Sequence, residues 1–275
     1  MSTLIDIKSI TQAHQLLGLD PPKHPLISVY EDCMIRFDRR FEGGRFTAEL
    51  YLILFKDSVS GSLGYGRNSY DFQEGTLVFV GPGQVPDVPP REVLEKSQGW
   101  SLIFHPDLVR KSHLGEIIDS FSYFDYDVNE ALHLSSEEQV FIYEIVRQLE
   151  KEYSQNLDKH SHRLIISNLE LLLNYCTRFY DRQFYTRTSF NKDLVAQFER
   201  LLKAYFNSDR LTLEGIPSVS YFGEALNMSA NYLSDLLKKE TGKSVKAHIN
   251  EWLIDKAKTA LLSSSASVSE IAYDL

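Results

Sequence analysis

Two short helical patterns joined by a minimal turn constrain this chain more than any other feature. The patterns cover Val219–Leu226 and residues 229–239, and both repeat apolar side chains at helical spacing. Only Asn227 and Met228 lie between them. Two helices joined so tightly are typical of a helix-turn-helix, whose second helix enters the major groove of DNA. The pattern therefore predicts that the chain reads DNA, although an ordinary helical hairpin has the same spacing.

Residues that begin and end helices flank both patterns. Ser218 or Ser220 can cap the first helix, because a serine hydroxyl accepts hydrogen bonds from the free N–H groups of the first turn. Ser229 is the expected N-cap of the second helix. Gly242 is the expected stop, since glycine adopts left-handed backbone angles at little cost.

The second helix pattern predicts which residues meet DNA. The first turns of a recognition helix face the base edges, and the residues at this place are Ala230, Asn231, Ser234 and Asp235. Asn231 can pair with adenine, and Asp235 can accept a hydrogen bond from the amino group of cytosine. Contacts with DNA phosphates are predicted for Ser229, Lys238, Lys239, Lys243 and Lys246. In an ordinary helical hairpin the same side chains would only face solvent.

A family resemblance supports the DNA-reading interpretation. The string LNMSANYLSDLLKKETGKS, then a long helical pattern and SVSEIAYDL, resembles the DNA-binding module of AraC/XylS-type transcription regulators. That module has two helix-turn-helix units joined by one long helix. Residues 246–262 resemble the joining helix, and residues 267–275 resemble the first helix of the second unit, with Ser267 and Glu270 as a capping box. The resemblance implies a regulator that binds double-stranded DNA as a homodimer, with RNA polymerase as a further partner.

Two departures from the family pattern bear on DNA affinity. The chain ends at Leu275, where the pattern continues, so the second helix-turn-helix is expected to be incomplete. Asp235 stands where many family members carry a basic or neutral residue, and its carboxylate repels phosphate. Residues 190–275 contain 10 Lys and Arg against 11 Asp and Glu, in a chain of net charge −9. Because phosphate neutralisation supplies much of the affinity for DNA, we expect weak and salt-sensitive binding.

Length and composition favour a cytoplasmic protein of two domains. The chain has 275 residues, of which 43% are hydrophobic, enough for substantial cores. Its two cysteines, Cys33 and Cys176, are far apart, which favours a reducing compartment over a disulfide framework. No apolar run reaches membrane-spanning length, and the N-terminus lacks the layout of a signal peptide, so no membrane partner is expected.

The pattern divides the chain into four parts. Residues 1–24 form an arm with a short helix, residues 25–130 are rich in strands, residues 131–185 form a helical linker or dimerisation region, and residues 190–275 form the DNA-binding domain. Strands are expected at residues 27–37, 45–55, 60–66, 68–73, 75–83 and 99–105. The predicted fold class is α+β, with an N-terminal antiparallel β-barrel or sandwich, flanking helices, and a C-terminal all-α helix-turn-helix domain.

Three longer helices are expected within the last two parts. Ser135 and Glu138 offer a capping box for the first, and the other two cover residues 164–180 and 191–206. The helix at 164–180 is apolar most of the way round. That surface is explained equally by packing against the strands and by a symmetric dimer interface.

The strand-rich part resembles the cupin-like sensor domain common in the same family. The resemblance rests on SYDFQEGTLVFVGPGQVP, a strand, an acidic-Gly turn, a second strand and a Pro-Gly turn. It implies a barrel that binds a small-molecule effector. Candidate polar anchors are Arg36, Tyr51, Tyr65 and Tyr70, but residues on a sheet face pair across strands in the same way, so no effector residue is assigned.

A metal-dependent cupin enzyme is the alternative from another class. Such an enzyme needs several histidines and a carboxylate directed into the barrel, yet residues 27–104 contain no histidine. His160 and His162 lie two positions apart, and such side chains diverge on a helix. No nucleophile, phosphate-loop or dinucleotide motif is present. We therefore predict no catalysis, no metal and no cofactor, and keep a sensor that acts by dimerisation without DNA as the other alternative.

Overall fold

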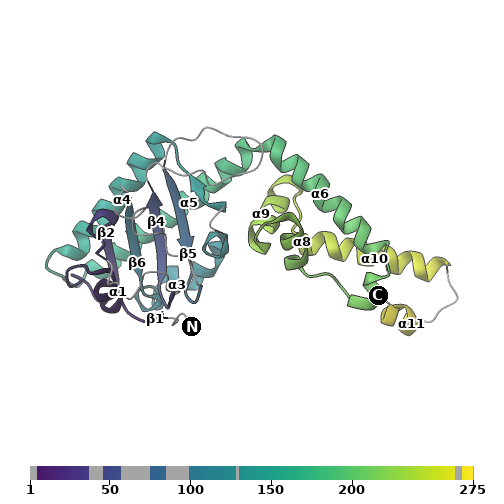
Figure 1. The fold of residues 1–275 in the computed structure, drawn as a ribbon, viewed down its shortest axis with the longest axis horizontal. Helices are drawn as coiled ribbons and strands as arrows, with labels where there is room; N and C mark the ends of the chain where they lie inside the picture. The colour runs from purple at the N-terminus through teal and green to yellow at the C-terminus, as the bar shows by residue number, and fades with distance from the viewer. Residues whose placement is uncertain are drawn as a thin grey trace. The chain divides into compact units, whose positions relative to one another are not determined.

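The computed structural model describes residues 5–36, 46–56, 75–84, 99–127, 130–263 and 268–274 (Figure 1). The chain forms two compact units, residues 1–181 and 182–275, and the boundary falls within helix α5, Ser161–Thr186. The first unit combines an antiparallel sheet with flanking helices, and the second is helical. The predicted two-domain α+β class is confirmed.

A five-stranded antiparallel sheet forms the centre of the N-terminal unit, in the order β2-β6-β4-β5-β7. The first four of these strands are labelled in Figure 1. The strands are β2 (Ile27–Glu31), β4 (Tyr51–Lys56), β5 (Thr76–Val80), β6 (Trp100–Phe104) and β7 (Leu132–His133). Every residue of β6 is buried, so both faces of this strand are covered. A parallel pair, β1 (Ile5–Ile7) with β3 (Phe46–Ala48), forms a second, short sheet.

Local turns shorten two of the predicted strands. The strand expected at residues 27–37 ends at Glu31, because Asp32–Met34 form a turn of 3-10 helix, η1. The strand expected at 45–55 is divided into β3 and β4 by a bend at residues 49–50. The strands expected at 60–66 and 68–73 lie outside the described residues.

Helices flank the sheet on several sides. They are α1 (Ile10–Leu17), α3 (His113–Ile117), α4 (Ser136–Ser154) and α5, with short 3-10 turns at Pro106–Leu108, Ile118–Ser120 and Ser122–Asp125. The short helix predicted in the N-terminal arm is α1, and Gly18 ends it in the left-handed conformation. The capping box of Ser135 and Glu138 is present at the start of α4, as predicted.

Tyrosine hydroxyls fix the two long helices of this unit. Tyr153 of α4 accepts a hydrogen bond of 2.8 Å from the N–H of Val29, a group that β2 does not use in its pairing with β6. Burial raises the pKa of Tyr153 to about 12, so this hydroxyl stays neutral. Tyr123 donates a hydrogen bond of 2.9 Å to the carbonyl of Leu173 in α5. The Tyr153 bond covers a polar backbone group at an edge of the sheet, and the Tyr123 bond joins α5 to the turn at Ser122–Asp125.

Six helices make up the described part of the C-terminal unit beyond α5. They are α6 (Thr188–Phe206), α7 (Arg210–Glu214), α8 (Val219–Leu226), α9 (Ala230–Thr241), α10 (Val245–Ser263) and α11 (Val268–Asp274). Side chains from α6 to α10 form one apolar core around Phe198, Phe206, Phe222 and Leu233. The sequence missed the short α7, and α6 begins three residues before its predicted start.

In the part of the chain that the structure describes, no helix combines the length and the apolar character needed to span a membrane.

Candidate nucleic-acid interface

The turn between α8 and α9 has a closed, well-defined backbone. Asn227 adopts the left-handed conformation, with φ of +55°, as the residue that ends α8. Its N–H donates to the carbonyl of Glu224 at 3.2 Å, and the N–H of Met228 donates to that of Gly223 at 2.9 Å. These two bonds form a Schellman motif, which satisfies the last carbonyls of the helix. The predicted turn residues therefore set the angle at which α9 leaves α8.

Gly223 makes this close approach possible. A Cβ atom at this position would lie 2.7 Å from the carbonyl oxygen of Met228, a distance that no side chain tolerates. Because the obstacle is backbone, it cannot move aside without opening the turn. The sequence interpretation missed this residue, although a glycine inside a helical pattern is itself a sign of close packing.

Serine caps begin both helices, and a glycine ends α9. Ser218, one of the two serines proposed for the first cap, accepts from the N–H of Tyr221 at 3.1 Å. Ser229 accepts from the N–H of Tyr232 at 3.2 Å. Gly242, with φ of +76°, ends α9 as predicted, and the helix continues two residues beyond the pattern at 229–239. The hydroxyl of Ser229 therefore already has a structural role, in addition to the phosphate contact predicted for it.

The predicted DNA-contacting residues of α9 share one side of the helix. Tyr232, Leu233, Leu236 and Leu237 are buried on the other side. Asn231, Lys238 and Lys239 are exposed, and Ala230, Ser234 and Asp235 are partly exposed. The spacing of three and four residues along this side makes a continuous polar stripe. The structure thus brings these residues together, and their contact with DNA stays a prediction.

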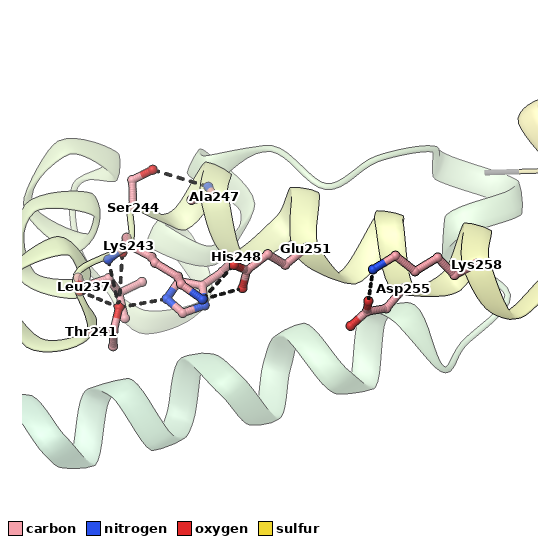
Figure 2. A network of polar contacts seen from close by, with 9 residues as sticks. All are labelled: Leu237, Thr241, Lys243, Ser244, Ala247, His248, Glu251, Asp255 and Lys258. Atoms are coloured by element: carbon pink, nitrogen blue, oxygen red, sulfur yellow. Dashed lines mark hydrogen bonds and ion pairs between the residues drawn. The ribbon is translucent and has the colours of Figure 1, made fainter.

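The two lysines predicted beyond α9 differ in their surroundings. Lys246 is exposed in the first turn of α10. Lys243 forms an ion pair with Glu251, with Nζ 2.6 Å from Oε1 (Figure 2). Both partners are about half exposed, so the pair contributes little to stability. Phosphate binding by Lys243 must therefore compete with Glu251, which weakens the prediction for this residue relative to Lys246.

A polar corner joins the end of α9 to α10 (Figure 2). Thr241 Oγ1 donates to the carbonyl of Leu237 at 2.8 Å and lies 2.9 Å from Nε2 of His248. With the threonine proton used in this way, we assign the proton between the two groups to Nε2 of His248. Burial lowers the pKa of His248 below its ordinary value, which favours the neutral ring. The corner fixes the start of α10 on α9.

The remaining candidates that the structure describes do not converge. His160 is exposed in the turn before α5, and His162 is exposed in the first turn of α5, with its Nε2 3.1 Å from the carbonyl of Leu108. Among the described residues, no three His, Cys, Asp or Glu side chains gather where they could hold a metal ion. Arg36 is exposed, and Tyr51 stacks on Phe104 with 4.8 Å between ring centroids. Tyr65 and Tyr70 lie outside the described residues.

Comparison with known proteins identifies the C-terminal part of the chain. Residues 222–275 match the model of a protein family described as a helix-turn-helix domain. The match begins within α8 and includes all of α9 and α10. No match was found among curated proteins, and none among solved structures. The family model supports an AraC-type, DNA-binding helix-turn-helix in this chain, and it does not extend to the sheet-containing unit.

Proposed function

We propose that the chain is a sequence-specific, AraC/XylS-type transcription regulator that binds double-stranded DNA through α9. The observation that carries this proposal is the polar stripe on α9, within the segment matched by the helix-turn-helix family. The stripe combines an amide and a carboxylate near the helix N-terminus with lysines near its C-terminus. This order suits base contacts by Asn231 and Asp235 and phosphate contacts by Lys238 and Lys239.

Control by a small molecule forms the second part of the proposal. An effector that binds the N-terminal unit more tightly in one conformation shifts the population towards that conformation. Coupling of this shift to the DNA-binding helices changes DNA affinity, and a homodimer would read two half-sites. The sheet and its flanking helices support this part of the proposal by providing a framework for an effector site. The fold does not specify the ligand, because sheet-containing domains serve many functions.

The decisive experiment measures DNA binding by fluorescence anisotropy. A selection from random duplexes at low salt identifies the preferred site, and affinity for it is then compared with affinity for a scrambled duplex. Asn231→Ala should relax preference at one base pair, a loss of about 1–3 kcal/mol of discrimination. Lys238→Ala should weaken both duplexes equally and reduce the slope of log affinity against log salt by about 0.9.

Lys111→Ala supplies the matched control, since Lys111 is an exposed lysine of the N-terminal unit. It should leave affinity, preference and salt slope unchanged. Failure of the wild-type chain to bind any duplex at low salt would reject DNA reading and favour a sensor that acts by dimerisation alone. Equal effects of the Asn231 and Lys238 variants would reject the division into base and phosphate contacts.

A further inference from the structure

A single buried amide connects α9 to the start of α6 and the end of α5. Asn191 of α6 has no exposed surface. Its Nδ2 donates a hydrogen bond of 2.8 Å to Oε1 of Glu240 in α9 and one of 2.7 Å to the carbonyl of Phe184 in α5. Both N–H groups of the amide are thereby used. All three residues belong to the C-terminal unit.

The amide is costly for stability at this position. Its Oδ1 is buried and has no hydrogen-bond partner. An unsatisfied buried oxygen loses its hydration without compensation, whereas an apolar side chain of similar size would avoid that loss. What Asn191 provides is therefore geometric, because its two hydrogen bonds form a fixed bridge between α5, α6 and α9. Buried asparagines can specify register at a cost in stability in the same way.

Phe184, which is linked to Glu240 through Asn191, also contacts α9 directly. Its ring lies 5.1 Å from the ring of Tyr232, measured between centroids, and Tyr232 is buried. Tyr232 and Glu240 are eight residues apart, about 12 Å along a helix. The side of α9 opposite the polar stripe is thus attached near both of its ends, and Phe184 takes part in both attachments.

We propose that Asn191 is a positioning residue that sets the orientation of α9 for DNA recognition. The proposal rests on the DNA-binding function proposed above. Base-reading side chains must be held within about 0.5 Å of their productive position by residues that do not touch the DNA. Loss of the bridge leaves α9 helical, because its caps and apolar side remain, but frees its Glu240 end to shift.

The test exchanges donor and acceptor across the bridge. Asn191→Asp removes both donated hydrogen bonds and places a carboxylate against Glu240, so specific DNA affinity should fall by about tenfold or more. Adding Glu240→Gln gives the new carboxylate a donor in place of the repelling acceptor. The double variant should recover part of that loss, because only the bond to α9 is restored and the carbonyl of Phe184 still lacks its donor. Asn207→Asp adds the same charge at the exposed end of α6 and should have no effect. Affinities are measured well below the unfolding temperature of each variant.

Hydrogen exchange of the α9 amides separates this proposal from the DNA-binding function itself. In Asn191→Asp the amides near Glu240 should exchange at least several times faster than in the wild type, and the double variant should restore protection. Normal exchange in Asn191→Asp, or absence of rescue by Glu240→Gln in both measurements, would overturn the positioning role. A wild-type chain that binds no DNA would reject the proposed function, while the exchange result would still decide whether Asn191 holds α9.

Discussion

The two units bury polar side chains to very different extents. Among the described residues, the N-terminal unit buries seven: His14, Ser28, Asp32, Thr76, Ser101, Glu130 and Ser161. The C-terminal unit buries two, Gln183 and Asn191. Helices satisfy their own backbone groups except at the ends, whereas the short strands and turns of the first unit rely on side chains.

The buried polar contacts of the first unit connect distant parts of the sequence. Asp32 accepts from Ser101 at 2.9 Å, across 69 positions, and forms an ion pair with Lys56. Nε2 of His14 lies 2.8 Å from the hydroxyl of Ser28, which joins α1 to β2. The C-terminal unit depends instead on backbone turns at its helix ends and on apolar packing. Substitutions should therefore destabilise the two units by different mechanisms.

The largest expected effect is that of Asp32→Ala. The change removes the buried carboxylate that pairs with the ammonium group of Lys56. Breaking such a pair lowers the free energy of unfolding by about 3 kcal/mol or more. Each unit contains one tryptophan, Trp100 in β6 and Trp252 in α10, so Trp252→Phe makes fluorescence report the N-terminal unit alone. Urea unfolding in that background should show a lower free energy of unfolding for the N-terminal unit with Asp32→Ala than without it.

The control for this prediction is Asp6→Ala. Asp6 forms exposed contacts, an ion pair with Lys8 at 3.2 Å and a hydrogen bond accepted from Thr47 at 3.1 Å, so removing it should change stability by no more than about 0.5 kcal/mol. Equal effects of the two variants would show that the Asp32 cluster does not hold the sheet. The contrast between the units would then lose its main support.

Gly223→Ala tests the backbone mechanism in the C-terminal unit. The added methyl group would meet the carbonyl of Met228, so the turn must open, at a net cost of about 2 kcal/mol. Unfolding followed by Trp252 in a Trp100→Phe background measures the loss. Glu224→Ala, at the exposed neighbouring position, should be nearly neutral. A stable Gly223→Ala variant would mean that the turn adapts and that α9 is not held by it.

Ser229→Ala removes the N-cap of α9. The N–H of Tyr232 then loses its acceptor, which should lower the stability of the C-terminal unit by about 1 kcal/mol. Unfolding followed by Trp252 fluorescence in the Trp100→Phe background measures this loss of stability. Ser229→Asp keeps a capping acceptor and should retain most of the stability, whereas a loss equal to that of alanine would exclude capping as the cause.

The smallest effect is a pH dependence from His248. Burial is the main cause of its lowered pKa, opposed by Glu251 and Glu199 and assisted by Lys243. The folded state therefore favours the neutral ring. The stability that follows is complete above the unfolded pKa of about 6.5 and declines as the pH falls towards the folded value. The unfolding midpoint of the C-terminal unit should drop between pH 7.5 and 5.5, and His248→Gln should reduce that drop. An identical drop in the variant would assign it to other groups.

Local signals predicted most of the C-terminal unit. Ser218, Ser229, Asn227 and Gly242 all stand where the sequence placed helix ends and the turn. The exposed stripe of α9 also follows from helical spacing alone. The strands were predicted less well, because the break at Asp32 arises from contacts with Gly99 and Ser101 far along the chain. A local sequence pattern does not predict a turn that is stabilised by residues far along the chain.

The sequence by itself determined the helix-turn-helix, since caps, a glycine stop and apolar spacing act within a few residues of one another. It also determined which side of α9 carries the polar stripe. Only the tertiary structure decided that Gly223 is needed for close approach, that Lys243 is paired with Glu251, and that Asn191 connects α9 to Phe184. Those features depend on how separate helices pack, and packing places side chains together that are far apart in the chain.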